Sequence, residues 1–309
     1  MATETMAPDR ASGPSSGFIF WLKRNWVRLA ASSPMIFTAV VVFTGCSIWT
    51  ILYSFTASRT LPELTFVGFD QYTRLFKASR WSIAYKNLIL YGVVSLTFSF
   101  VLGFIMAVLL DQKIRFENTF RTIYLYPFAL SFIVTGIAWQ WMFDPMFGIQ
   151  KVVQAWGFTD FKFNMLGNRN TVMWAIIIAG LWQGTGLTMV LMLAGLRTVD
   201  DEIWKAARVD GIPKWKTYLF IVLPIMRPVL ITNLVISAAG VVRLYDLVVA
   251  LTKGGPGNFS DVPAKYVFDY MFGGNNLGQG LAGSTVMLIA VLIILIPWMY
   301  YEYGSKKRT

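Results

Sequence analysis

Long apolar runs alternate with polar segments along the 309 residues of the chain. Six of these runs reach the length of about 20 residues that a helix needs to cross a hydrocarbon core about 30 Å thick. The pattern predicts an all-α membrane protein whose transmembrane domain occupies residues 34–301, between terminal tails at 1–33 and 302–309. The six predicted transmembrane helices lie at residues 34–56, 88–110, 122–143, 171–195, 229–252 and 282–301.

The composition agrees with a membrane location. Hydrophobic residues make up 56% of the chain and charged residues only 14%, against roughly 25% charged residues in soluble domains. A soluble domain of this length would have too little polar surface to cover itself.

The formal net charge of +11 comes from basic residues scattered between apolar runs. Because they do not form one basic face, we predict membrane lipid as the partner of these charges, and no nucleic acid. The segments on the side of the two termini hold 16 Lys and Arg, the opposite loops hold 10, and Arg243 lies within a span. This bias predicts cytoplasmic termini. The stretch FIFWLKRNWVRL at 18–29 fits either a helix along the lipid headgroups or a basic flank of the first span.

The chain has no histidine and a single cysteine, Cys46. This inventory excludes Ser-His-Asp and Cys-His catalytic systems, His-ligated metal sites and internal disulfides. No G-x-x-x-x-G-K-[ST] phosphate loop occurs in the sequence. We therefore expect a protein that is not an enzyme, with no catalytic residue, no metal and no cofactor bound by this chain.

The polar stretch 196–228, between the fourth and fifth predicted spans, indicates a helix, a sharp turn and a second helix. Thr198 is the predicted N-cap, Gly211 the predicted stop, and Pro213 can open the next helix. One face of the first helix carries two alanines, so it is thin and suited to the close approach of a partner, with Lys205 and Arg208 beside it. An amphipathic connector on the membrane surface is the alternative. The residues of the thin face are Ile203, Ala206, Ala207 and Asp210.

Charged and polar residues inside predicted spans are the candidates for a substrate path. Arg243 and Asp246, three residues apart, either pair with each other on a helix or line a pore, and Tyr245 between them can hydrogen-bond sugar hydroxyls. The other candidates are the amides of Gln140, Gln183 and Asn233. Gly180 and Gly184 form a close-contact motif for helix packing.

Two motifs resemble those of a known family. The stretch AARVDGIPKWKTYLFIVLPIMRP resembles the EAA loop of permease subunits in bacterial binding-protein-dependent ABC importers, and RLYDLVVALTKGGPGNFSD at 243–261 resembles the maltose-type carbohydrate subgroup. Lys205 departs from the first pattern, because the family usually has glutamate there. The matching residues are Ala206, Ala207, Asp210, Gly211, Leu223 and Pro224 in the first motif and Tyr245, Asp246, Thr252, Gly254, Gly255 and Pro256 in the second.

The resemblance implies a carbohydrate permease subunit of the bacterial inner membrane, with a glucose or a glucoside among the candidate substrates. Its implied partners are a second permease, two ATP-binding subunits that hold ATP and Mg, and a periplasmic solute-binding protein that meets the loops 144–170 and 253–281. The helix near 201–210 would be the cytoplasmic coupling helix. The alternatives are an ABC importer permease for a non-sugar or an anionic glycoside, a secondary transporter, and an intramembrane enzyme that uses Asp246.

Overall fold

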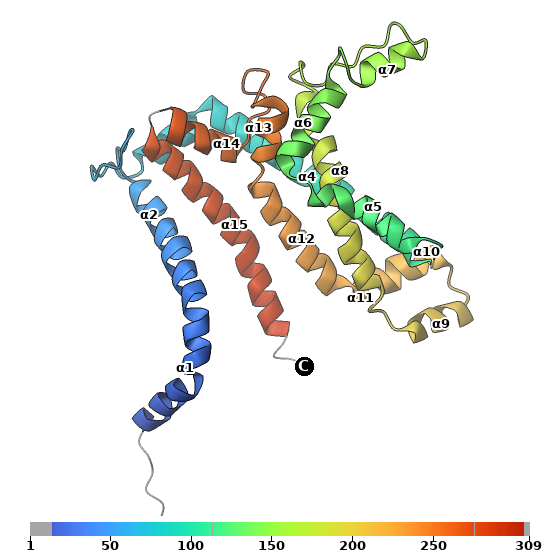
Figure 1. Ribbon diagram of the computed structural model, residues 1–309, viewed down its shortest axis with the longest axis horizontal. Coiled ribbons are helices and arrows are strands. Elements are labelled where there is room, and N and C mark those ends of the chain that lie inside the picture. The colour runs from blue at the N-terminus through green and yellow to red at the C-terminus, as the bar shows by residue number, and fades with distance from the viewer. Residues whose placement is uncertain (1–13, 113, 275, 306–309) are drawn as a thin grey trace, which may run out of the picture. The chain divides into compact units, whose positions relative to one another are not determined.

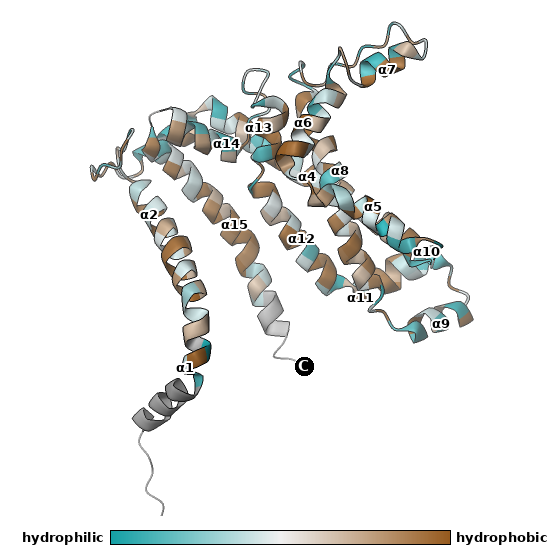
Figure 2. Cartoon of the chain, in the orientation of Figure 1, coloured by the Kyte–Doolittle hydropathy of each residue, from teal (hydrophilic) through white to brown (hydrophobic). Residues whose placement is uncertain are grey.

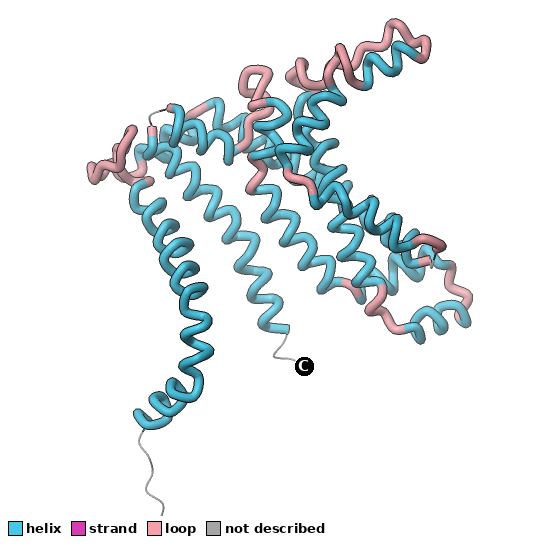
Figure 3. The backbone as a smooth tube through the Cα atoms, viewed as in Figure 1, coloured by secondary structure: helices cyan, strands magenta, loops and turns pink. Residues whose placement is uncertain are grey.

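The computed structural model describes residues 14–112, 114–274 and 276–305, and helices dominate these ranges (Figure 1). No β-strand occurs in them, and the only extended pairing is an isolated bridge between Thr56 and Phe66 (Figure 3). The predicted all-α class is confirmed. The chain divides into two compact units, residues 1–52 and 53–309. The outermost parts of the predicted tails, 1–13 and 306–309, lie outside the described residues.

The N-terminal unit is a run of helix. Its described residues form α1 (Pro14–Thr38), the π-helical segment η1 (Ala39–Gly45) and α2 (Cys46–Tyr53), whose last residue belongs to the larger unit. Residues Asn25–Tyr53 are long and apolar enough to cross a membrane. The stretch 18–29 lies within α1 and is therefore helical, which both the interfacial helix and the basic flank allow.

The larger unit contains the remaining helices, and the longest connections between these helices are residues 156–171 and 253–262. In chain order they are α3 (Asp70–Lys77), α4 (Ser79–Asp111), α5 (Glu117–Ala129), α6 (Phe132–Phe143), α7 (Ile149–Ala155), α8 (Val172–Leu196), α9 (Asp201–Val209), α10 (Lys214–Lys216), η2 (Thr217–Val222), α11 (Leu223–Ile225), α12 (Arg227–Val242), α13 (Asp246–Thr252), α14 (Pro263–Phe268), η3 (Asp269–Gly273) and α15 (Leu277–Ser305).

Four helical segments of the described chain are long and apolar enough to span a membrane: the N-terminal one, α4, α8 and α15. Two bent helix pairs, α5–α6 at 97° and α10–α12 at 74°, raise the number to six if each pair is one span. The count of six stays a prediction for those pairs. The prediction that the third and fifth spans are uninterrupted helices is wrong.

The third span breaks after Pro127. Proline lacks an amide hydrogen and weakens the preceding turn of a helix, and Leu130 and Ser131 then adopt extended backbone. The hydroxyl of Ser131 caps the new helix α6 by accepting a hydrogen bond from the backbone amide of Ile133 at 3.3 Å. Proline and an N-cap serine thus convert one predicted helix into two.

The bent pair α10–α12 turns at Met226, whereas the predicted fifth span, 229–252, breaks at its charged residues. Helix α12 ends at Val242, and α13 begins at Asp246. The intervening Arg243 and Tyr245 leave helical geometry, with Tyr245 at φ −138° and ψ −63°. An acidic residue in the first turn suits the positive end of a helix dipole, so Asp246 is favourably placed at the start of α13.

Helix α8 forms the centre of the larger unit. It packs against α4 and α5, and its buried residues contribute to two apolar clusters. A side chain at Gly180 would meet the Tyr91 hydroxyl and one at Gly186 the Tyr124 carbonyl oxygen, whereas a Cβ at Gly184 would meet no atom within 4 Å. The close contact predicted at Gly180 is confirmed, and Gly186 rather than Gly184 makes the second one.

Large apolar side chains are exposed along several helices of the bundle. Figure 2 shows mainly hydrophobic positions along α12 and α15 and hydrophilic positions on α9. Exposed side chains of α4 and α15 include Val93, Phe98, Ile289 and Ile293. Such surface needs lipid or a partner protein to cover it, because water would not solvate it favourably.

Candidate functional site

Polar segments gather at the two ends of the larger unit. Helix α9 and the C-terminal end of α15 lie at one end, whereas α7, α13 and α14 lie toward the other (Figure 1). The candidate site residues divide between the α9 hairpin and the chain breaks within the bundle.

The α9 hairpin begins with a side-chain cap. The Asp200 carboxylate accepts a hydrogen bond from the Glu202 amide at 2.9 Å, which satisfies one free donor of the first turn. The prediction of Thr198 as the N-cap is wrong, because its hydroxyl donates to the Gly195 carbonyl at 2.7 Å. Asp200, two residues later, has the extended backbone that the cap position needs.

The helix ends in the predicted glycine turn. Gly211 has φ +69°, which glycine adopts without steric cost. The amide of Ile212 donates to the carbonyl of Ala207 at 2.9 Å, and that of Gly211 donates to Arg208 at 3.2 Å. These two bonds form a Schellman motif. Pro213 then occupies the cap before α10, so the predicted helix, turn and helix are confirmed.

The predicted thin face of α9 is directed partly toward its own chain. Ala207 is only 4% exposed, and Ile203 and Trp204 pack on the apolar cluster formed by α4, α8 and η2. The indole of Trp204 meets the ring of Tyr218 edge-on, with centroids 5.0 Å apart. The expectation that Ala207 points outward is therefore wrong. The side chains left exposed on this helix include Lys205, Ala206, Arg208, Val209 and Asp210.

A groove of about 480 Å³ lies beside the hairpin, lined by the ends of α4, α5 and α8. Arg197 crosses this region. Its guanidinium lies 2.5 Å from a Glu117 carboxylate oxygen and 3.8 Å from Asp111. Because Arg197 is 43% exposed, these pairs contribute modestly to stability.

Arg243 and Asp246 do not pair with each other. Both are exposed, and neither takes part in an ion pair within the part of the chain that the structure describes. The helix on which pairing depended ends at Val242. Tyr245 packs on Phe268, with ring centroids 5.2 Å apart.

The amide candidates have different environments. Gln183 is 2% exposed and donates through Nε2 to the Leu130 carbonyl at 2.7 Å, at the break between α5 and α6. Asn233 is fully buried and accepts a long hydrogen bond from Ser237 at 3.5 Å. Gln140 is exposed on α6. The three amides do not form one site. Gln183 instead stabilises the break between α5 and α6.

A four-charge cluster, Arg80, Asp261, Lys265 and Asp269, joins α4 to α14 and η3. Arg80 bonds to the carboxylates of both Asp261 and Asp269. Lys265 Nζ lies 3.5 Å from Asp261 and 2.6 Å from Asp269. Sequence reasoning missed this cluster. The only local signal was the spacing of four between Asp261, Lys265 and Asp269, which places them on one helical face.

The charges of this cluster change the acidity of Asp269. Burial opposes its ionisation, but hydrogen bonds from Lys265 and Arg80 outweigh burial and hold the pKa of Asp269 below its usual range. Asp261 has no exposed surface. The four charges balance, so the cluster is a paired structural element. Within the described residues, no group of three or more Cys, Asp or Glu is arranged to hold a metal ion.

Broken spans around a central helix, with a capped polar hairpin at one end, define the chain as a multi-span helical membrane protein of the kind that transporters use. Residues 99–306 match the family described as the binding-protein-dependent transport system inner membrane component. The chain belongs to this family, and the resemblance to permease subunits of such importers is confirmed.

Curated relatives match along most of the chain. A probable ABC transporter permease of Pyrococcus horikoshii is 35% identical over 84% of this chain and 90% of its own length. The xylose/arabinose import permease XacH of Haloferax volcanii is 32% identical over 96% of this chain and 95% of its own. The trehalose/maltose permease MalF of Thermococcus litoralis is 28% identical over 80% and 83%.

The fold matches a solved structure. A bacterial ABC transporter involved in the import of the acidic polysaccharide alginate contains a chain that superposes with a TM-score of 0.79. That match covers 94% of this chain and 99% of the other at 19% sequence identity. At this identity the likeness defines the fold alone.

Proposed function

We propose that this chain is a permease subunit of an ATP-driven ABC importer that moves a carbohydrate from the periplasm to the cytoplasm by alternating access. Relatives that import xylose, arabinose, trehalose and maltose support the substrate class. The proposed partners are a second permease, two ATP-binding subunits and a periplasmic solute-binding protein. ATP and Mg are bound by the ATP-binding subunits, because this sequence contains no phosphate loop.

The observation that carries the proposal is the rigid attachment of the α9 hairpin to the spans. Asp200 caps its start, a glycine turn closes its end, and Ala207 is buried against the chain. Force applied to α9 therefore reaches α8 and η2 through packed side chains. A docked ATPase can shift the spans only if its contacts with α9 differ in free energy between two states, and coupling of about 1–3 kcal/mol is usual.

This assignment orients the chain in the inner membrane. The end with α9 is proposed as cytoplasmic, together with both termini, and the end with α7, α13 and α14 as periplasmic. The side chains of Lys205, Ala206 and Arg208 are proposed as the contact with the ATP-binding subunit. The buried Ala207 and the glycine turn at Gly211 support that surface from beneath.

The break between α12 and α13 is the proposed part of the substrate path. Charges within a membrane domain are costly unless they face water or a partner, and Arg243 and Asp246 are exposed without an ion pair in the described chain. With Tyr245 they offer donors and acceptors to sugar hydroxyls. Gln140 is exposed and remains a candidate, whereas the buried Gln183 and Asn233 act on the path only indirectly.

The test is reconstitution of the full complex in lipid vesicles, with a panel of labelled sugars as transport substrates. The expected result is uptake of one sugar class that requires both ATP and the loaded solute-binding protein. ATPase activity should be absent from the purified chain and present in the complex. Uptake by this chain alone, driven by an ion gradient, would instead favour a secondary transporter.

A further inference from the structure

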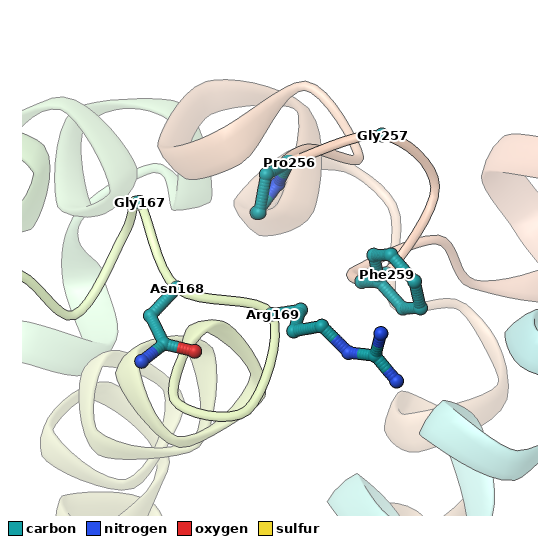
Figure 4. Close-up of a pocket in the computed structure, with 6 residues that line it drawn as sticks. All are labelled: Gly167, Asn168, Arg169, Pro256, Gly257 and Phe259. Carbon is teal, nitrogen blue, oxygen red and sulfur yellow. The ribbon is translucent and has the colours of Figure 1, made fainter.

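Two loops that are far apart in the sequence enclose an open hollow of about 490 Å³ at the end of the larger unit opposite α9 (Figure 4). One loop precedes α8 and contributes Gly167, Asn168 and Arg169. The other follows α13 and contributes Pro256, Gly257 and Phe259. The hollow therefore joins the two segments, 144–170 and 253–281, that the proposed function assigns to the periplasm.

Hydrogen bonds hold the first wall of the hollow, the loop that contributes Gly167, Asn168 and Arg169. The Gly167 amide donates to the Asn164 side chain at 2.8 Å, and the Thr171 hydroxyl donates to the Met165 carbonyl at 2.9 Å. Hydrogen bonds also hold the second wall, the loop that contributes Pro256, Gly257 and Phe259. Asn87 of α4 donates to the Phe259 carbonyl at 2.9 Å, and the Ser260 hydroxyl donates to the Gly255 carbonyl at 2.6 Å. Binding to such a site loses little conformational entropy, because its backbone is already ordered.

Arg169 is the charged side chain of this hollow. Its guanidinium lies over the ring of Phe259, 4.6 Å from the ring centroid, so that a residue of one wall orients a residue of the other (Figure 4). Arg169 is exposed and forms no ion pair or side-chain hydrogen bond in the part of the chain that is described. The planar guanidinium thus keeps its donors for a carboxylate, which it can bind through two parallel bonds.

The net charge of the loops proposed as periplasmic favours an acidic partner. The segments 57–87, 144–170 and 253–281 together hold 10 Lys and Arg and 6 Asp and Glu. Surplus positive charge attracts a complementary negative surface and rejects a like-charged one. Arginine is also one of the residues that most often dominate the binding energy of protein interfaces.

We propose that the Arg169–Phe259 hollow is a docking point for an Asp or Glu side chain on the surface of the solute-binding protein. This inference rests on the proposed function, because it needs that protein as the partner. Arg169 supplies the charge, and Phe259 fixes its direction.

The experiment uses the complete transporter in nanodiscs, titrated with its sugar-loaded solute-binding protein while ATP hydrolysis is followed. Arg169→Glu should raise the concentration for half-maximal stimulation at least about tenfold, which corresponds to about 1.4 kcal/mol. Basal hydrolysis should not change. Lys162→Glu is the matched control, because it makes the same charge change on an exposed residue of the same loop that does not line the hollow. It should change the half-maximal concentration less than about twofold.

Equal effects of Arg169→Glu and Lys162→Glu would overturn the proposal, because net charge alone would then explain them. Unchanged stimulation of Arg169→Glu would also overturn it. Arg169→Gln, which is neutral and similar in size, replaces the glutamate variant if that variant fails to assemble. If free glucuronate competes with stimulation of the wild type but not of the variant, the hollow binds an acidic sugar instead. A wild-type complex that no loaded binding protein stimulates would refute the proposed function itself.

Discussion

Removal of Arg80 from the four-charge cluster should destabilise the protein strongly. Arg80→Ala leaves Asp261, which has no exposed surface, with Lys265 as its remaining ionic partner at 3.5 Å. Breaking a buried ion pair by removing one partner costs about 3–5 kcal/mol, because the other charge stays buried. Arg80 is 23% exposed and Lys265 still compensates in part, so we expect a loss of about 2–4 kcal/mol in the free energy of unfolding.

The assay is denaturant unfolding of the purified protein in mixed micelles. Arg74→Ala is the control, because Arg74 forms an ordinary surface pair with Asp70 in which both side chains are about half exposed, at 61% and 47%. Such a pair contributes about 0–1 kcal/mol. Equal losses in the two variants would refute the argument that burial makes the Arg80 pair important.

The pH dependence gives a second test of the same cluster. The pKa of Asp269 is lowered in the folded protein, so its stabilising effect is complete above the unfolded value of about 3.9. It is lost as pH falls through the lower folded pKa. The stability difference between the wild type and Arg80→Ala should therefore shrink below about pH 4. A difference that stays constant down to pH 2 would contradict this assignment.

Two further pairs of variants test the packing, and one more variant tests the hairpin. Gly186→Ala should sharply reduce the yield of folded protein, because its Cβ would lie 2.1 Å from a backbone oxygen, whereas Gly184→Ala should fold normally; equal yields would contradict the close approach. Gln183→Leu should cost about 1 kcal/mol by removing the hydrogen bond to the partly buried Leu130 carbonyl, and Gln140→Leu, at an exposed position, should have little effect in the same unfolding assay. Ala206→Trp should reduce co-purification of the ATP-binding subunits without changing the stability of the chain; full recovery of the complex would exclude this surface as the docking contact.

Local chemistry made much of this protein predictable. The lengths of the apolar runs indicated the spans, because crossing a bilayer requires a minimum number of apolar residues. The hairpin turn was predictable from Gly211 and Pro213, whose backbone preferences act within a few residues. The N-cap was misplaced by two residues, because Thr198 and Asp200 are both good caps and tertiary context selected between them.

Only the tertiary structure decided where the spans break and which polar residues meet. The break after Val242 follows no proline, and the charges at Arg243 and Asp246 are equally compatible with a continuous helix on which they pair. Ala207 proved to be buried, because the hairpin folds back on α8 and η2, a contact that helical spacing cannot predict. Arg80 meets Asp261 across 181 positions of the sequence. The apolar pattern and turn residues therefore determined the elements, because these depend on near neighbours. Which charged residues pair in the buried cluster depends on the packing of distant segments. That packing excludes water, and an unpaired charge is costly without water.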